Sequence, residues 1–330
     1  MLTPRENYLA VINHEAADYV PNIATDAAMV GGALETFENG PLGGGYDDFG
    51  LKWLCTASAN GQAVPDPECH PVPDILEWKK YLKFPDLDKY DWEGMASAQL
   101  NGVDRSQKVV IYGTWNSIFL RFSHMLGFED ALCAMYEEPE ACYDMMSAIT
   151  DYKCRLVDYI YKYFKPDIIT SYDDVCTERG PFMSPETYRK LIKPMHKRFN
   201  DAVKSYGILP SQHCCGKCEE LIPDFIDEGA VCWEAAQPTN DIEKILDTYG
   251  DRFVVVGGYD TNGTPGQENA TDDIIKAEVK RMMDAYASKG SFIPMGFLLS
   301  SDPDPMAFVK NMLRIAGYVE ELKNNYNYKK

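Results

Sequence analysis

Residues 208–260 read ILPSQHCCGKCEELIPDFIDEGAVCWEAAQPTNDIEKILDTYGDRFVVVGGYD, and their pattern indicates the fold class. Three apolar segments of strand length, ILPSQHC, AVCWEAA and FVVVGGYD, alternate with CEELIPDFIDEG and NDIEKILDTYG, whose apolar residues recur at helical spacing. The alternation continues through the helix ATDDIIKAEVKRMMDAYASKG, the strand SFIPMGF and the helix DPMAFVKNMLRIAGYVEELK. Strands that alternate with helices in this way are parallel, and each helix crosses over between two neighbouring strands.

Three further strands are expected upstream, over VPNIATD (Val20–Asp26), KVVIYGT (Lys108–Thr114) and DIITSY (Asp167–Tyr172). They bring the total to seven, one fewer than a (β/α)8 barrel has, and the eighth is expected in the irregular region between the first two. A doubly wound sheet is the weaker interpretation, because no Gly-rich GxGxxG loop follows the first strand. We therefore predict an α/β fold with one domain over residues 1–330, a single (β/α)8 TIM-type barrel with an irregular N-terminal excursion.

The excursion covers Met29 to about Gln107, where DDFGLKWLCTAS predicts a short strand or hairpin. Prolines set the helix boundaries after it. Pro139 is placed to start a long helix, and Ser184 is placed to cap the next one. Pro194 lies inside that second helix and should kink or break it.

The charge balance excludes several classes of partner. The chain has 32 basic and 51 acidic residues, which gives a net charge of −19. Nucleic acids and anionic membranes bind positive surfaces, so neither is expected as a partner. No targeting signal and no apolar segment of membrane-spanning length is visible. We expect a cytoplasmic protein that acts on small molecules, with its ten cysteines in a reducing compartment.

In a barrel of this kind, the active residues lie at the carboxyl ends of the strands and in the loops that follow. Polar and metal-binding side chains follow nearly every predicted strand. In chain order these are Asp26, Tyr112–Asn116, Tyr172–Asp174, His213–Cys215, Glu234 with Gln237, Tyr259–Asp260 and Phe297–Asp302.

The most specific of these segments is His213-Cys214-Cys215-Gly216-Lys217-Cys218. Side chains two residues apart on a strand point to the same face, so His213 and Cys215 can meet one ion. Imidazole and thiolate are common zinc ligands, and a site with an open position can activate a substrate. The alternative is a buried histidine among small cysteines. Cys232 also lies close by, and the six cysteines elsewhere are interpreted as small buried residues.

Acidic and aromatic residues supply the other candidates. Asp173 and Asp174 follow a strand and suit general acid chemistry, although a turn or cap pair is the alternative. Asp260, beside Tyr259, has a turn-like context but stands at a strand end. An aromatic pocket, with core packing as the alternative, is predicted from Trp53, Trp115, Trp233 and Tyr259.

Over nearly its whole length the sequence resembles the uroporphyrinogen decarboxylase superfamily. The resemblance is carried by TPRENYLAVINHEAADYVP, by SYDDVCTERGPFMSPETYRKLIKPMHKRF, by HCCGKCEELIPDFIDEGA and by VVGGYDT. It implies a single (β/α)8 barrel with its site at the carboxyl ends of the strands. True decarboxylases of the family have an N-terminal Arg-rich motif, whereas this chain reads NIATDAAMVGG at that place.

The resemblance is therefore closer to the corrinoid-dependent methyltransferase branch. That branch implies zinc held by His213 and Cys215, and methyl transfer between a small methylated compound and a corrinoid on a partner protein. The methylated compound would be of the methanol, methylamine or methoxy-aromatic type. A late cysteine often supplies a third ligand there, but this chain has Phe297, so Glu234, Cys218 or Asp260 would take that place.

Two alternatives come from other classes. One is a lyase that decarboxylates a smaller acid, and the other is a non-catalytic barrel that binds a corrinoid or tetrapyrrole. A homodimer is also allowed. A corrinoid protein would have to cap the barrel mouth, and the rim residues expected there, with buried core as the alternative, are Trp53, Phe119, Phe182, Met183 and Phe297.

Overall fold

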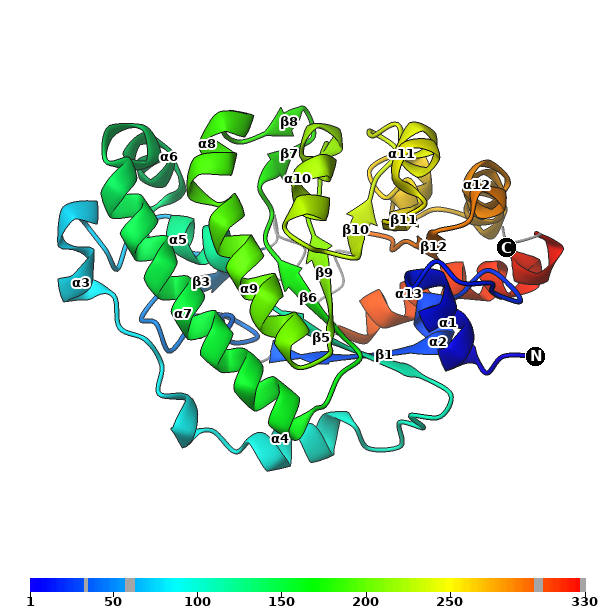
Figure 1. Cartoon of the computed structure of the whole chain (residues 1–330), viewed down its shortest axis with the longest axis horizontal. Coiled ribbons are helices and arrows are strands. Elements are labelled where there is room, and N and C mark those ends of the chain that lie inside the picture. The colour runs from blue at the N-terminus through cyan, green and yellow to red at the C-terminus, as the bar shows by residue number, and fades with distance from the viewer. Residues whose placement is uncertain (33–34, 57–62, 300–304, 327–330) are drawn as a thin grey trace.

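The computed structural model describes residues 1–32, 35–56, 63–299 and 305–326. Its centre is a seven-stranded sheet in which every neighbouring pair is parallel. The order is β1 (Ala27–Gly31), β5 (Val109–Thr114), β6 (Ile168–Tyr172), β9 (Leu209–His213), β10 (Cys232–Ala236), β11 (Val254–Gly258) and β12 (Phe292–Met295). The sheet is curled, and the predicted α/β barrel-type fold is confirmed (Figure 1).

Helices surround the sheet on its outer side (Figure 1). Helix α9 packs against strand β9, helix α11 against β11, and helix α12 against β12. The α-helices are α1 (Pro4–Ile12), α2 (Ile23–Asp26), α3 (Trp78–Tyr81), α4 (Trp92–Gln99), α5 (Ile118–Leu126), α6 (Phe128–Glu137), α7 (Pro139–Tyr163), α8 (Pro185–Leu191), α9 (Lys193–Ser205), α10 (Ile222–Asp227), α11 (Ile242–Tyr249), α12 (Asp272–Tyr286) and α13 (Pro305–Leu322). Short 3₁₀ turns are η3 (Ile75–Glu77), η4 (Leu87–Lys89), η5 (Glu219–Leu221), η6 (Thr264–Gly266), η7 (Ala287–Lys289) and η8 (Lys323–Asn325).

Proline and cap residues set the helix ends as predicted. Pro139 is the first residue of α7. The Ser184 hydroxyl accepts a hydrogen bond from the Thr187 N–H at 3.1 Å, which caps α8. The predicted break at Pro194 is also confirmed, because α8 ends at Leu191 and α9 begins at Lys193. In the described part of the chain, no helix is both long and apolar enough to cross a membrane.

The prediction of a strand over Val20–Asp26 is wrong. Asn22 caps a helical turn by accepting a hydrogen bond from the Ala24 N–H, and its own N–H donates to Asp26 at 3.0 Å. Such local side-chain bonds compete with strand pairing, and β1 begins only at Ala27. Asp26 thus lies at the amino end of β1, the opposite end from the predicted mouth.

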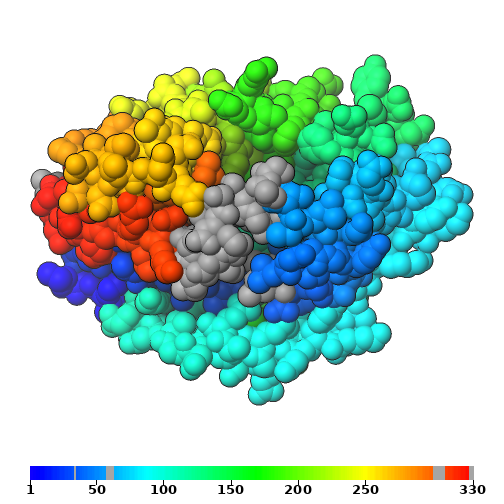
Figure 2. Space-filling view, turned by 180° about the vertical axis from the view of Figure 1, so that it is seen from behind, coloured from blue at the N-terminus to red at the C-terminus, as the bar shows by residue number. Residues whose placement is uncertain are grey.

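The expected eighth strand is absent from this sheet among the described residues. The short helix α2 contacts both edge strands, β1 and β12. The predicted hairpin of the excursion exists, but it forms a separate antiparallel sheet of β2 (Gly45–Tyr46), β3 (Lys52–Cys55) and β4 (Ala63–Pro65). Figure 2 shows the excursion, in blue to cyan, on one side of the molecule and residues near the C-terminus, in orange to red, on the other.

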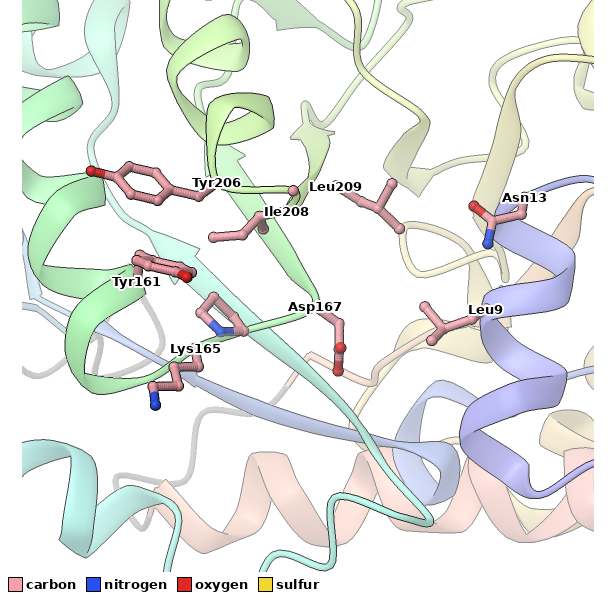
Figure 3. A pocket seen from close by; sticks show the side chains of 10 residues that line it. Leu9, Asn13, Tyr161, Lys165, Asp167, Tyr206, Ile208 and Leu209 are labelled. Atoms are coloured by element: carbon pink, nitrogen blue, oxygen red, sulfur yellow. The ribbon is translucent and has the colours of Figure 1, made fainter.

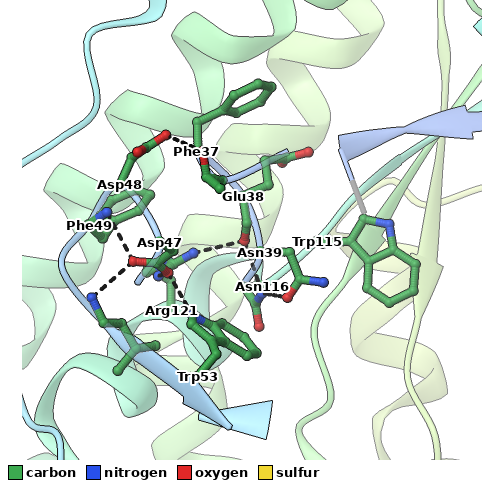
Figure 4. A network of polar contacts seen from close by, with 12 residues as sticks. Phe37, Glu38, Asn39, Asp47, Asp48, Phe49, Trp53, Trp115, Asn116 and Arg121 are labelled. Atoms are coloured by element: carbon green, nitrogen blue, oxygen red, sulfur yellow. Dashed lines mark hydrogen bonds and ion pairs between the residues drawn. The ribbon is translucent and has the colours of Figure 1, made fainter. Parts of the chain in front are cut away.

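Two buried ion pairs hold the excursion to the helices. Arg121 Nη1 on α5 lies 2.6 Å from Asp47, and both side chains are fully buried. Lys153 Nζ on α7 lies 3.0 Å from Glu38 and donates a second bond to the Trp115 carbonyl at 2.7 Å. Figure 4 shows the contacts of Arg121 and Asp47 in this region. These pairs fasten the excursion to α5 and α7, and a single domain over residues 1–330 stays a prediction.

A buried histidine, His196 of helix α9, lies between two carboxylates, and α9 packs against β9. His196 Nε2 on α9 is 2.7 Å from Asp173, and Nδ1 is 3.4 Å from Glu228. The Tyr188 hydroxyl donates to Glu228 at 2.6 Å. Burial alone lowers the pKa of His196, but the hydrogen bonds and charges of Asp173 and Glu228 outweigh it and raise the pKa to about 10.

This shift makes the stability of the fold depend on pH. The pKa of His196 is higher in the folded chain than its usual 6.5, so its contribution is complete below about pH 6.5 and is lost as the pH rises through about 10. We expect the free energy of unfolding in urea to fall over this window, by at most about 1.4 kcal/mol per pH unit for one proton. His196→Gln should unfold more easily at pH 7 and lack this decline. An equal decline in the variant would contradict the assignment.

Candidate functional site

The candidate site lies where the parallel strands β6, β9 and β10 end. In the sheet register, Tyr172 of β6 and Glu234 of β10 are the two partners of His213, the last residue of β9. The carboxyl ends of the three strands are therefore side by side, and the residues that follow them meet. This arrangement brings together the predicted residues Asp174, His213, Cys215 and Glu234.

His213 is held between these groups by both ring nitrogens. Nδ1 lies 3.2 Å from Glu234 Oε1, while Nε2 lies 3.6 Å from Cys215 Sγ and 3.9 Å from Asp174 Oδ1. The ring also stacks on Tyr172, with centroids 4.3 Å apart. Tyr172 stacks in turn on Trp115, again at 4.3 Å. The stack leaves the imidazole little freedom to rotate.

One ligand atom each from His213, Cys215 and Asp174 lies within 4.8 Å of the other two, and we call this set the His–Cys–Asp site. The Cys215 N–H donates to Asp174 Oδ1 at 2.6 Å, which fixes the carboxylate beside the thiol. Nitrogen, sulfur and oxygen donors in one group are the set that zinc accepts in catalytic sites. The residues present therefore fit a zinc ion.

The positions of Glu234 and Asp174 differ from those expected from the sequence. Glu234, predicted as a ligand, faces Nδ1 and lies on the other side of the ring from Cys215. A carboxylate in this position orients a metal-binding histidine rather than binding the metal itself. Asp174, predicted as an acid, lies beside the ligands. The arrangement favours Asp174 as third ligand, and the roles of both residues stay predictions.

Charge in the site favours a cation. Burial by itself lowers the pKa of His213, but hydrogen bonds with Cys215 and Glu234 outweigh it and raise the pKa well above 6.5. Burial and the hydrogen bond with Glu234 also raise the pKa of Tyr172 well above 10, so its hydroxyl keeps its proton. Negative groups thus dominate around the imidazole.

Asp173, the other predicted acid, points away from the His–Cys–Asp site. Its fully buried carboxylate accepts hydrogen bonds from three backbone N–H groups at the start of α5, at 2.8–3.1 Å, and contacts His196. It therefore anchors α5 and α9 to the end of β6. This is the cap arrangement that the sequence left open as its alternative.

Tyr259 and Asp260 serve a neighbouring loop. The buried Tyr259 donates its hydroxyl hydrogen bond to the Pro265 carbonyl at 2.8 Å. Asp260 accepts a bond from the Gly263 N–H at 2.8 Å, which is a turn contact. Neither contact joins the His–Cys–Asp site, and catalytic roles for these two residues stay predictions. Residues 300–302, also expected at the mouth, lie outside the described residues.

A group of three cysteines adjoins the His–Cys–Asp site. The sulfurs of Cys176, Cys214 and Cys218 all lie within 4.8 Å of one another and are buried, and we call them the thiol cluster. Such a set could bind a metal such as zinc. Hydrogen bonds from the other two thiols lower the pKa of Cys176, whereas burial raises the pKa of Cys214 and of Cys218.

Sequence reasoning missed Cys176 in this role. It was interpreted as one of six small buried residues, because it lies in β7 (Cys176–Thr177), far from the other two cysteines in sequence. Strand β7 pairs with β8 (Gly180–Pro181) in the segment that follows β6. The only available signal was that β6 and β9 are consecutive parallel strands, whose following loops must be neighbours.

The predicted aromatic residues divide by burial. Trp53, Trp233 and Tyr259 are at most 3% exposed and belong to the core, and Phe119 is fully buried. Trp53 and Phe119 therefore cannot be rim residues as expected, since their rings pack inside. Phe182, Met183 and Phe297 are half-buried, as is Trp115. These four residues are the aromatic and thioether candidates that keep some exposure.

A hollow of about 360 Å³ lies at the opposite end of the strands. Asp167, just before β6, and Leu209, at the start of β9, line it together with Tyr161 and Tyr206, whose rings stack at 4.4 Å. Figure 3 shows these side chains around it. Because His213 ends β9 and Leu209 begins it, this hollow is separate from the candidate site.

Fold and site together define an α/β barrel-type protein with a His–Cys–Asp site at the carboxyl ends of its strands. The family model described as uroporphyrinogen decarboxylase (URO-D) matches residues 92–306, and the chain belongs to this family. A solved structure described as a methyltransferase from Methanosarcina mazei has a similar fold, with a TM-score of 0.71. The match covers 98% of this chain and 99% of the methyltransferase chain, and the two sequences are 16% identical. No curated protein matches the chain.

Proposed function

We propose that this chain is a methyltransferase that moves a methyl group between a small methylated compound and the cobalt of a corrinoid carried by a partner protein. The observation that carries the proposal is the convergence of His213, Cys215 and Asp174 at the end of β9. The shared fold with a protein described as a methyltransferase supports it. The methylated compound would be an alcohol, an amine or a methoxy-aromatic compound.

Each residue of the site would have its own role in the reaction. Zinc bound by His213, Cys215 and Asp174 would supply Lewis acidity to the heteroatom that carries the methyl group. With zinc bound, Glu234 would accept the proton of His213 Nδ1 and leave Nε2, on the side of Cys215, free to bind the ion. The stacked Tyr172 and Trp115 hold the ring in this orientation. The partner would have to approach from the strand ends, where Trp115 is half-buried.

The test is methyl transfer with a purified corrinoid protein in its reduced state. Methanol, methylamine and a methoxybenzene are offered in turn, and the absorbance of the corrinoid is followed with and without the chain. We expect one compound class to methylate the corrinoid only when the chain is present. Binding of the corrinoid protein with no transfer would instead favour the non-catalytic alternative. No binding and no transfer would contradict the proposal.

Uroporphyrinogen should not be a substrate. The stretch NIATDAAMVGG, over residues 22–32, has no arginine to bind the carboxylates of the porphyrinogen, and the chain has a net charge of −19. We expect no coproporphyrinogen and no carbon dioxide above the level of a buffer control. Detectable product would place the lyase alternative in front of methyl transfer.

A further inference from the structure

The thiol cluster is a second group of side chains that could hold a metal ion, and it shares no residue with the His–Cys–Asp site. Cys214 and Cys218 are fully buried, and Cys176 is 5% exposed. The His–Cys–Asp site is more open, since the Asp174 side chain is 37% exposed. Three sulfurs within 4.8 Å of one another provide soft donors of the kind that zinc accepts in closed structural sites.

Backbone contacts bring the three thiols together. The Lys217 N–H donates to the Thr177 carbonyl at 2.8 Å, which joins the loop after β9 to strand β7. Gly216 has a φ of +88°, and a Cβ there would lie 2.4 Å from the Thr177 oxygen. Only glycine permits this close approach. The cluster is thus held by contacts that do not depend on the sulfurs.

Contacts at the far side of the loop complete this frame. The Cys218 N–H donates to the Asn240 side chain at 2.7 Å, and the Trp233 ring N–H donates to the Cys214 carbonyl at 2.8 Å. The Val175 N–H points at Cys214 Sγ, 3.4 Å away. A backbone N–H directed at sulfur is a contact that also favours a thiolate ligand.

We propose that Cys176, Cys214 and Cys218 bind one zinc ion in a buried site with a structural role. The positions of these cysteines in the sequence indicate what the ion would do. Asp174 lies two residues before Cys176, and Cys215 lies between Cys214 and Cys218. The ion would therefore cross-link the two loops that carry two of the three His–Cys–Asp ligands. It would fix their positions without touching a substrate.

The test is the zinc content of the full chain, purified without chelators and then exposed to a mild chelator. We expect wild type to keep one zinc per chain after this treatment, and Cys176→Ala to lose it. Cys142→Ala is the matched control, because Cys142 on α7 is also fully buried but lies outside the cluster. Cys142→Ala should keep the ion. Equal zinc in the Cys176 and Cys142 variants, or none in wild type, would overturn the proposal.

Two further measurements separate this proposal from the others. Cys215→Ser should keep the resistant ion, since it removes a ligand of the His–Cys–Asp site only, so the two sites can fail independently. If Cys176→Ala does not fold, cadmium-loaded wild type answers the question by cadmium NMR, whose shift reports the number of thiolate ligands. A three-thiolate signal supports the proposal. A disulfide within the cluster, detected by peptide mass analysis without reductant, would overturn it.

Discussion

Replacing Cys215 by serine should reduce methyl transfer by about a hundredfold or more. Substitution of residues that only orient metal ligands lowers metal affinity or activity by about 10–100-fold. Loss of a ligand itself should lower activity by at least the upper end of this range. The Cys215 sulfur lies 3.6 Å from His213 Nε2, and a serine hydroxyl is a poorer zinc ligand than a thiolate. The measurement is the rate of corrinoid methylation together with zinc per chain.

Cys133→Ser is the matched control for this variant. Cys133 is an exposed cysteine on α6 that belongs to neither the His–Cys–Asp site nor the thiol cluster, so the same chemical change is made outside both. We expect its activity and zinc content to equal those of wild type. If Cys215→Ser also kept both, zinc at the His–Cys–Asp site and the proposed chemistry would be contradicted together.

The sheet could be predicted because its signal is local. Short apolar segments such as VVVGG and the amphipathic helices between them specify parallel strands without knowledge of distant residues. The His213 and Cys215 pair was found for the same reason, since two residues of one strand end carry it. The strand over Val20–Asp26 failed where the side chain of Asn22 offered the backbone a helical turn instead.

The rest of the site depends on contacts between strands, which the sequence does not display. The choice between Glu234 and Asp174 depends on which ring nitrogen of His213 each one faces, and only the register of β6, β9 and β10 determines that. Cys176 joins the thiol cluster for the same reason. Adjacent residues can also diverge, since Asp173 faces α5 while Asp174 faces Cys215.

Replacing Asp47 by alanine should greatly lower the free energy of unfolding. Asp47 accepts hydrogen bonds from Arg121 at 2.6 Å, from the Trp53 ring N–H at 3.1 Å and from the Leu51 N–H at 2.9 Å. Arg121 is fully buried, so removal of the carboxylate leaves a guanidinium charge without its partner (Figure 4). Breaking such a pair costs about 3–5 kcal/mol, a large share of the roughly 5–15 kcal/mol that stabilise a typical domain.

Urea unfolding should show this loss as a lower midpoint. Asp251→Ala is the control, because Asp251 forms an ion pair of 2.9 Å with Arg252 in which the two side chains are 73% and 52% exposed. Exposed pairs contribute about 1 kcal/mol or less. The double variant Asp47→Ala/Arg121→Met should regain part of the loss, because it removes the uncompensated charge as well. If Asp47→Ala cost no more than Asp251→Ala, the pair with Arg121 would contribute little to holding the excursion on α5.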